Sequence, residues 1–179
     1  SGGMQLLGKN SGITMLPAAG ITYAKRANKA EININGALAS GGSTEIAANA
    51  DSKIEAKAIS TAGDNLPDIA LSITDGSNAS KVTIGEKARM AGQDLGDGLK
   101  ADLAGDVTIK ANSTNSLTTS ASVKEKDSTV VATAINITDY DSSADVAINS
   151  SVKAGGSLDI AAENTVTDNE VTADNAMGT

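Results

Sequence analysis

Apolar residues alternate with polar ones along most of the chain, in short stretches broken by small and polar residues. Examples of the alternating pairs are Ile32/Ile34, Val107/Ile109, Ile135/Ile137 and Leu158/Ile160. A period of two places the apolar side chains on one face of a β-strand. Because Gly, Asn, Asp and Ser interrupt the stretches, we expect strands of roughly three to five residues joined by turns. The pattern predicts an all-β protein whose strands have one buried and one wet face.

The chain also repeats itself directly. Residues 32–46 recur without a gap at 146–160, and residues 69–75 recur at 133–139. A middle copy of the unit is interrupted by an extra stretch at 93–103. These matches define roughly three copies of a unit of about fifty residues, and such direct repetition is the sequence signature of stacked-repeat folds.

A parallel β-helix, in which strands stack as a solenoid, accounts for both the alternation and the direct repeat. A β-sandwich is less compatible, because its two sheets lie ~10 Å apart and usually need bulky residues between them. With coils of roughly 20–25 residues, we expect about seven to nine coils. Residues 31–179 would form these repeats, with an inserted loop at about 93–103. Residues 1–30 depart from the repeat and would form an irregular segment or a first coil.

Composition supports a thin core and excludes several functions. The chain has no Trp, Phe, Cys or His and only two Tyr, yet 40% of its residues are hydrophobic. A net charge of −8 disfavours binding to nucleic acid, whose phosphates require basic patches. The one basic cluster, Lys25, Arg26 and Lys29, fits a solvated turn or chain end. No apolar stretch approaches the ~20 residues of a membrane-spanning helix, so we expect no membrane insertion.

Two turns with Ala-Gly precede alternating strands: Ala154-Gly155 comes before Leu158-Asp159-Ile160, and Ala104-Gly105 before Val107-Thr108-Ile109. This arrangement resembles the repeat of filamentous-haemagglutinin-like exoproteins. The segments 134–140 and 163–167 look like parts of the large leukotoxin-type filamentous adhesins of anaerobic bacteria. The resemblance covers roughly residues 31–172.

The resemblance implies a right-handed parallel β-helix (a solenoid fragment) that forms part of a long surface fibre. Proteins of this family are secreted to the bacterial cell surface through an outer-membrane export partner. They serve in adhesion, biofilm contact or toxin delivery, and several contribute to virulence. A receptor or glycan on a host or neighbouring cell is therefore the expected partner.

Candidate chemistry is sparse. Without His or Cys the chain lacks the residues of histidine-based triads and of typical zinc sites. We expect no enzyme activity and no cofactor. The inserted stretch carries Asp94, Asp97 and Asp102 near glycines, which could ligate Ca²⁺ or simply form a solvated loop. The candidate binding residues are Asp94, Asp97 and Lys100 in this loop, and Tyr140, which replaces Gly76 at an equivalent corner and is expected to point outward.

These features favour a non-catalytic structural or adhesive stalk segment of a large secreted surface protein. The alternative is a module that binds carbohydrate or protein directly through the inserted loop, and a third reading is a polysaccharide-active β-helix enzyme. Glycosylation is a further possibility at four sequons, which begin at Asn78, Asn112, Asn136 and Asn149.

Overall fold

The computed structural model describes residues 4–61, 68–124 and 132–175, with the side chains of residues 20–60, 69–124 and 132–175. The chain is 79% strand, and every regular element in the described residues is a β-strand. The prediction of an all-β protein is confirmed.

Seven long strands form two parallel sheets. The strands of sheet A are, in spatial order, β1 (Met4–Ala19), β3 (Thr44–Thr61), β7 (Val107–Lys124) and β9 (Leu158–Asn175). Those of sheet B are β2 (Ile21–Ile34), β4 (Asp68–Ile84) and β8 (Ala132–Ile148). A small antiparallel hairpin consists of β5 (Asp94–Gly96) and β6 (Leu99–Lys100).

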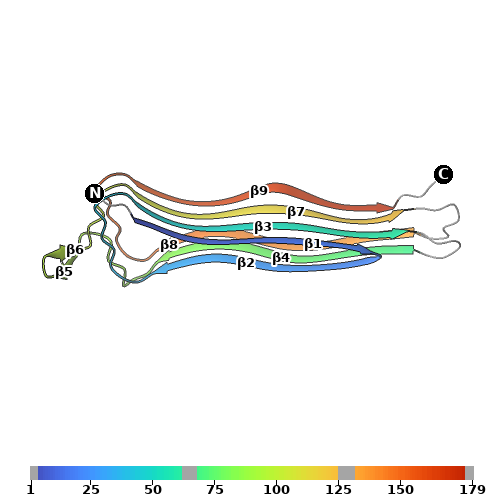
Figure 1. Ribbon diagram of the computed structural model, residues 1–179, viewed down its shortest axis with the longest axis horizontal. Helices are drawn as coiled ribbons and strands as arrows, with labels where there is room; N and C mark the ends of the chain where they lie inside the picture. Colours follow the sequence, from blue (N-terminus) through green and yellow to red (C-terminus); the bar gives the residue numbers. More distant parts are fainter. Residues whose placement is uncertain (1–3, 62–67, 125–131, 176–179) are drawn as a thin grey trace.

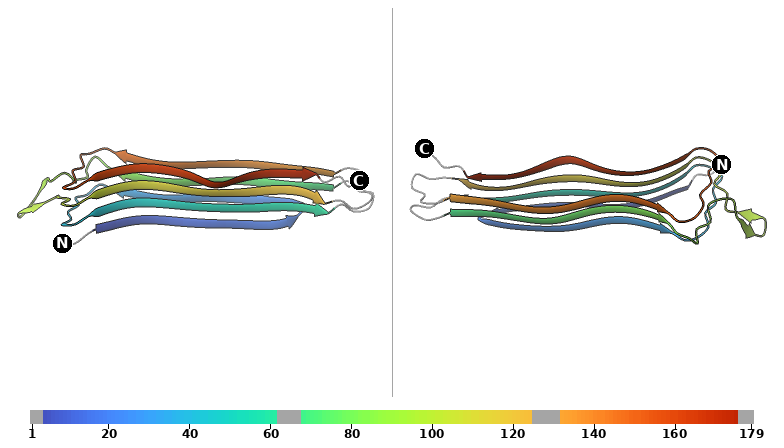
Figure 2. Two further views of the ribbon diagram at one scale, coloured as in Figure 1. Left: turned by 90° about the horizontal axis from the view of Figure 1, so that it is seen from above. Right: turned by 180° about the vertical axis from the view of Figure 1, so that it is seen from behind.

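The chain alternates between the two sheets, so each circuit adds one strand to sheet A and one to sheet B. Figures 1 and 2 show these strands running side by side along the long axis of the molecule, with the β5–β6 hairpin projecting at one end. Every pairing between the long strands is parallel, which confirms the predicted parallel β architecture.

The register of the sheets confirms the repeat found in the sequence. Ile46 pairs with Ile109, and Ile109 pairs with Ile160 in the next strand. In sheet B, Val82 lies between Ile32 and Val146. Residues that match in the repeat therefore stack directly on one another, as expected when each copy adds one level.

The predicted strand and coil lengths were wrong. The long strands contain 14 to 18 residues rather than a few. Met4 pairs with Thr44, 40 residues further on, and Asp68 with Ala132, 64 residues further on, so far fewer circuits exist than expected. The reason is that polar residues taken as turns continue the strands, and some of them, such as Asn78 and Ser80, have their side chains inside the protein. The N-terminal segment contributes β1 and β2, and the basic cluster lies on β2 rather than in a turn.

The interior lies between the two sheets and is filled mainly by Ala, Val and Ile. The largest apolar cluster lies at the end of the sheets nearest the hairpin and includes Ile34, Ile46, Val82, Ile84, Met90, Leu103, Val107 and Ile109. A second cluster at the other end consists of Ala58, Ala70, Ala121, Val123 and Ala132. Small and branched side chains suit an interior only one sheet-to-sheet spacing thick, ~10 Å.

A chain of asparagine amides crosses the interior between these clusters. Asn28 Nδ2 donates to Asn78 Oδ1 at 2.8 Å, and Asn78 Nδ2 donates to Asn115 Oδ1 at 2.9 Å. Asn115 Nδ2 in turn donates to Asn164 Oδ1 at 2.8 Å. Asn78 and Asn115 are each only 1% exposed, so their amides must find partners within the protein. The chain of amides links strands of both sheets at successive levels.

The three connections that lead from sheet B to sheet A are also stacked. They consist of residues 35–43, 85–106 and 149–157. Bridges join Ser40 to Leu103 and Leu103 to Ala154. A Cβ on Gly105 would lie 2.6 Å from the Gly42 carbonyl oxygen, and one on Gly155 would overlap the Ala104 carbonyl. The Ala-Gly turns seen in the sequence thus have a physical basis, because only glycine lets the stacked backbones approach this closely.

We expect Asn78→Ala to lower the free energy of unfolding by about 2–4 kcal/mol, because it removes the buried amide that is hydrogen-bonded to Asn28, to Asn115 and to the Ala50 carbonyl oxygen. Urea unfolding followed by circular dichroism measures the change. Asn112→Ala is the matched control, since the Asn112–Asn49 amide bond lies on the partly exposed outer face of sheet A. Its cost should stay within about 1 kcal/mol. Equal losses in the two variants would contradict a special role for the interior amides.

Candidate interaction sites

The β5–β6 hairpin interrupts an otherwise regular stack of connections. Met90 bridges to Val152, and Leu103 bridges to Ala154. Residues 91–102 therefore occupy the place that the single residue Lys153 takes at the next level. The hairpin projects beyond the ends of the sheets and is the feature of this end that departs from the repeat (Figure 1).

The tip of the hairpin is a tight turn with exposed side chains. Gly96, Asp97 and Gly98 all have positive φ, of 87°, 52° and 76°. Glycine adopts this conformation readily, and Asp does so more easily than most residues. Next to the turn, Leu99 is 64% exposed and Lys100 is also exposed. These side chains are available for contact with a partner.

The three aspartates considered as calcium ligands are spread along the inserted stretch. No group of three or more acidic, His or Cys side chains that could hold a metal ion occurs in the described part of the chain. The Asp94 Oδ1 atom instead accepts a hydrogen bond from the Gly96 amide at 2.9 Å. This carboxylate stabilises the turn, as Asp side chains commonly do. Asp97 lies at the tip and Asp102 at the base, so the three acids do not form one site.

A cavity of about 310 Å³ lies at the base of the hairpin. Its lining includes two side chains of opposite charge, Asp102 and Lys153, together with Leu103 and backbone of Gly92 and Gly155. The cavity forms where the longer connection meets the shorter one above it. Together with the tip, it gives this end of the molecule a surface that the other levels lack.

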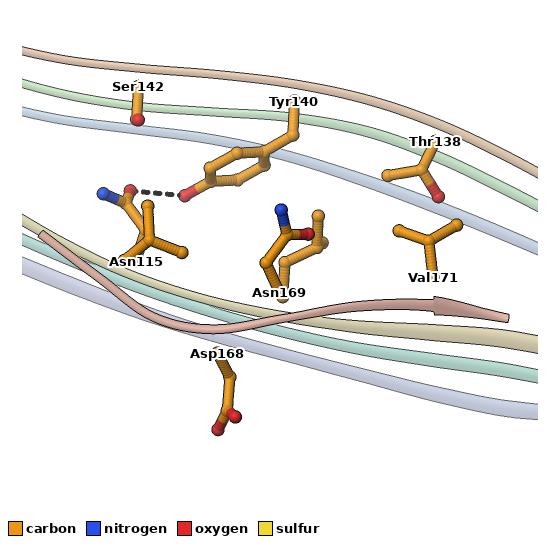
Figure 3. Close-up of a pocket in the computed structure, with 9 residues that line it drawn as sticks. Asn115, Thr138, Tyr140, Ser142, Asp168, Asn169 and Val171 are labelled. Atoms are coloured by element: carbon orange, nitrogen blue, oxygen red, sulfur yellow. Dashed lines mark hydrogen bonds between the residues drawn. The ribbon is translucent and has the colours of Figure 1, made fainter.

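A second cavity, of about 370 Å³, lies between the last strands of the two sheets. Its residues come from β7, β8 and β9: Asn115, Leu117, Thr138, Tyr140, Ser142, Val166, Asp168, Asn169 and Val171. Figure 3 shows the Tyr140 ring reaching from β8 toward Asn115, and its hydroxyl donates to Asn115 Oδ1 at 2.7 Å. Burial raises the pKa of the Tyr140 phenol.

The expectation that Tyr140 points outward from a corner was wrong. Tyr140 lies in the middle of β8 and faces the interior, in register with Gly76 on β4. A Cβ on Gly76 would lie 2.7 Å from the Tyr140 ring and 2.7 Å from Ile54 Cδ1. The ring therefore fits because its neighbour has no side chain. Tyr140 is not part of the hairpin surface, where only Asp94, Asp97 and Lys100 of the four binding candidates are found.

The structure separates the four sequons. Asn78 is buried, and its amide is engaged in the interior hydrogen bonds, so it cannot accept a glycan in the folded protein. Asn136 also faces inward and donates to Thr119 Oγ1 at 3.0 Å. Asn112 is half-buried in the asparagine pair on the outer face of sheet A, and Asn149 is exposed in a connection.

No protein-family model, curated protein or solved structure matches this chain. The resemblance to filamentous-haemagglutinin-like proteins therefore remains a prediction. The described residues also contain no helix long and apolar enough to cross a membrane.

Stability should depend on the ionisation of Tyr140 at alkaline pH. Because the folded pKa is raised, the folded chain holds the phenolic proton more tightly than the unfolded chain. This contribution is complete below the ordinary tyrosine pKa of about 10 and is lost as the pH rises through the folded value. Urea unfolding between neutral and alkaline pH should show a loss that Tyr140→Phe reduces.

Tyr23→Phe is the control for this experiment, since Tyr23 lies on an exposed outer face. In that variant Tyr140 is the remaining tyrosine, so its ionisation can be followed by ultraviolet absorbance without interference. An alkaline loss that is the same in the wild-type chain and in Tyr140→Phe would contradict the assignment.

Proposed function

We propose that this chain is a non-catalytic segment of a right-handed parallel β-helix that serves as a structural or adhesive stalk in a large secreted bacterial surface protein. The observation that carries the proposal is the stacking of direct repeats in register, with Ile46, Ile109 and Ile160 aligned in successive strands. A fold of this kind can be lengthened by adding circuits without changing the existing ones.

The outermost level supports this reading. Leu158 and Ile160 of β9 are 43% and 44% exposed, whereas their partners Val107 and Ile109 in β7 are almost fully buried. A further circuit placed on β8 and β9 would bury the exposed pair as the present circuits bury the inner one. The edge of β9 also offers unpaired backbone groups to a following strand.

The resemblance of residues 31–172 to filamentous-haemagglutinin-like proteins supplies the setting of the proposal. In that setting the segment lies outside the bacterial cell, reaches the surface through an outer-membrane partner, and holds a more distal element against a receptor or glycan on another cell. Its contribution is geometric, since the number of circuits sets the reach of the fibre.

The second candidate function is direct binding through the β5–β6 hairpin. It is favoured by the replacement of a single residue, Lys153, by residues 91–102 at the preceding level. A stalk needs only the short connection, as residues 35–43 and 149–157 demonstrate by completing their circuits without a hairpin. The exposed Leu99 and Lys100 would then make the contact.

One replacement tests the two candidates. Residues 91–102 are exchanged for a single lysine, so that Met90 and Leu103 are joined as Val152 and Ala154 are joined by Lys153. Because the hairpin lies outside the stacked sheets, we expect the free energy of unfolding to change by no more than about 1 kcal/mol. For a stalk, neither this variant nor the wild-type chain should bind cell surfaces or glycan arrays.

The double variant Leu99→Ser, Lys100→Ser is the control that keeps the length of the connection. Binding by the wild-type chain that both variants lose would overturn the stalk assignment and favour the hairpin as a binding element. Release of products from acidic polysaccharides, assayed with and without Ca²⁺, would overturn the non-catalytic assignment.

A further inference from the structure

The two ends of the strand stack carry opposite charge. In the described residues β1 pairs only with β3 and β9 only with β7, so these strands form the two edges of sheet A (Figure 2). We call β1 and β2 the basic end, and β8 and β9 the acidic end. The charged residues of the basic end are Lys9, Lys25, Arg26, Lys29 and Glu31, a net charge of +3. The acidic end contains three acidic residues on β8, five on β9 and no basic residue, a net charge of −8.

Most carboxylates of the acidic end have no cationic partner among the described residues. Lys81 pairs with Asp145 at 4.0 Å, and Lys110 pairs with Asp159 at 3.5 Å. Six other residues form no ion pair in the part of the chain that the structure describes: Asp139, Asp141, Glu163, Asp168, Glu170 and Asp174. Because like charges on neighbouring strands repel, a strand that covers β9 should bring positive charge and no further acid.

The acidic end also has uncovered apolar side chains that point toward the interior. Leu158, Ile160 and Val171 of β9 are 43%, 44% and 48% exposed, although the positions paired with them on β7 are buried. The apolar residues on the outer face of sheet B are different. Ile135 and Ile137, which the alternation placed in the core, face outward and stay exposed whatever lies on β9. The exposure along β9 therefore marks an inner face that awaits a further strand.

We propose that the acidic end binds the basic end of a second copy of this chain, with β1 of that copy paired in parallel to β9. The contact continues an interface that the molecule already contains, because β1, β3, β7 and β9 are paired in one register. It is heterologous, so it can repeat and lengthen the stack copy by copy. The inference goes beyond the stalk function, which lengthens the stack within one chain, because it joins separate chains.

The residue types along the inner rows of sheet A match at this contact. A second copy that follows β9 in the same register continues every row of the sheet. Asn10 shares a row with Asn164, so an asparagine position follows an asparagine, as Asn78 follows Asn28 in sheet B. Apolar positions likewise follow apolar ones: Met4 on Leu158, Leu6 on Ile160, and Leu16 on Val171.

Charge matches in the same register. Lys9 shares a row with Asn49, Asn112 and Glu163, so the second copy brings the Lys9 position next to Glu163 of the first. β1 contains no acidic residue, so no carboxylate of β9 meets a like charge on the strand paired with it. Pairing β9 with β9 of another copy would instead join two strands of five acidic residues each. Charge thus selects the contact between unlike ends.

Sheet B accommodates the contact because it has one strand fewer than sheet A. β8 and the β2 strand of the second copy then lie about two strand spacings apart, ~10 Å. Lys25 is aligned with Asp139 across this interval, since both share a row with Asp75. Within its own copy Lys25 pairs with Asp75 at 3.6 Å, so its charge lies between two carboxylates.

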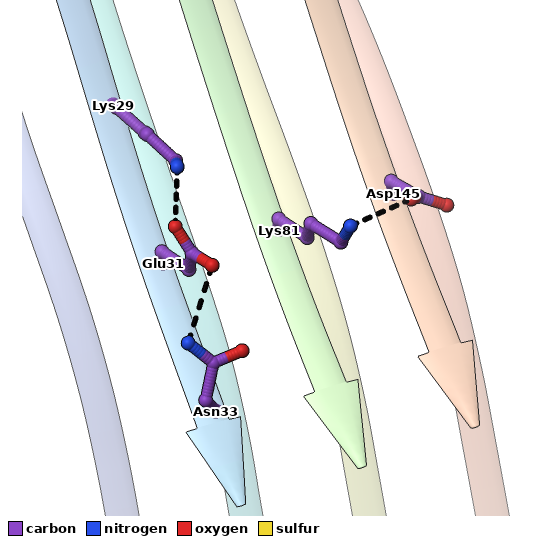
Figure 4. A network of polar contacts seen from close by, with 5 residues as sticks. All are labelled: Lys29, Glu31, Asn33, Lys81 and Asp145. Carbon is purple, nitrogen blue, oxygen red and sulfur yellow. Dashed lines mark hydrogen bonds and ion pairs between the residues drawn. The ribbon is translucent and has the colours of Figure 1, made fainter. Parts of the chain in front are cut away.

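One row of sheet B brings two acidic residues into line. Glu31 shares a row with Lys81 and Asp145, so Glu31 of the second copy is aligned with Asp145 of the first. Figure 4 shows that both carboxylates already face a lysine, Lys29 for Glu31 and Lys81 for Asp145. Their charges are therefore balanced within each copy, which limits the repulsion across the interval.

The size of the contact fits specific, reversible association. β1 has 16 residues and is ~53 Å long at ~3.3 Å per residue. With ~10 Å between the sheets, each end face covers roughly 500 Å², so that two copies bury about 1,000 Å², the lower limit of specific interfaces. Backbone hydrogen bonds between β9 and β1 add to this contact, and Pro17 removes one donor from them because it lacks an N–H group.

Sedimentation of the full chain at concentrations on the order of 100 µM, which detects micromolar dissociation constants, tests the stacking. We expect the wild-type chain to form species larger than a monomer, in a proportion that rises with concentration. Glu163→Lys should weaken this association by about 10-fold, because two lysines then meet at the contact. Adding Lys9→Glu to that variant should restore most of the association, since the pair is then reversed rather than repulsive.

Asp51→Lys is the matched control. It makes the same change of charge on the outer face of β3, a strand that is already paired on both sides. The association of this variant should equal that of the wild-type chain. Circular dichroism confirms that all the variants are folded.

A wild-type chain that stays monomeric would overturn the proposal, and so would association that Glu163→Lys does not weaken. A loss that Lys9→Glu fails to restore would overturn the register of the contact. None of these results depends on the hairpin replacement that tests the stalk function, so the two proposals can fail separately.

Discussion

The fold depends on the buried asparagine amides that link each level to the next. An amide in a dry interior needs both a donor and an acceptor partner, and leaving either unpaired costs more than the bond itself contributes. Asn78 satisfies this requirement with Asn28 on one side and Asn115 on the other. A shift of one strand by one residue would turn such an amide toward the solvent and leave its neighbours unpaired. The requirement therefore fixes the register along which the apolar rows, the charged rows and the glycine turns are aligned.

The thin interior explains the composition of the chain. Two sheets that approach closely leave room between them for Ala, Val, Ile, Ser, Thr and Asn, but not for many aromatic side chains. The one ring inside the described interior, that of Tyr140, lies over a residue without a side chain and extends into the space at the last level. Glycine has the same role in the connections, where Gly105 and Gly155 contact the backbone of the preceding level. Neighbouring levels thus contribute most of the packing around any given residue.

Much of the architecture was readable from the sequence, but its dimensions were not. Direct repetition identified residues that stack, because equivalent residues of successive copies have the same surroundings. Strand length was underestimated because Asn, Ser and Thr are common in turns and also occur in the interior of this protein. Only the hydrogen-bond partners of Asn78 and Asn115 show that these residues belong to the interior. The same ambiguity hid the orientation of Ile135 and Tyr140, since alternation defines two faces without saying which is buried. The hairpin was detectable as an insertion. Its aspartates, however, gave no sign that the carboxylate of Asp94 would accept a hydrogen bond within the turn.

The length of the strands also has a mechanical consequence. When a stack of strands is pulled along its stacking direction, the backbone hydrogen bonds between two neighbouring levels are loaded together. A level built from strands of 14 to 18 residues divides the load among many bonds in each sheet, whereas a level of three short strands divides it among few. Separation must then begin by peeling from one end of a strand, where the force is concentrated on the last few bonds. At the hairpin end, that peeling would meet the large apolar cluster and the stacked glycine turns first, so this end should yield last under tension.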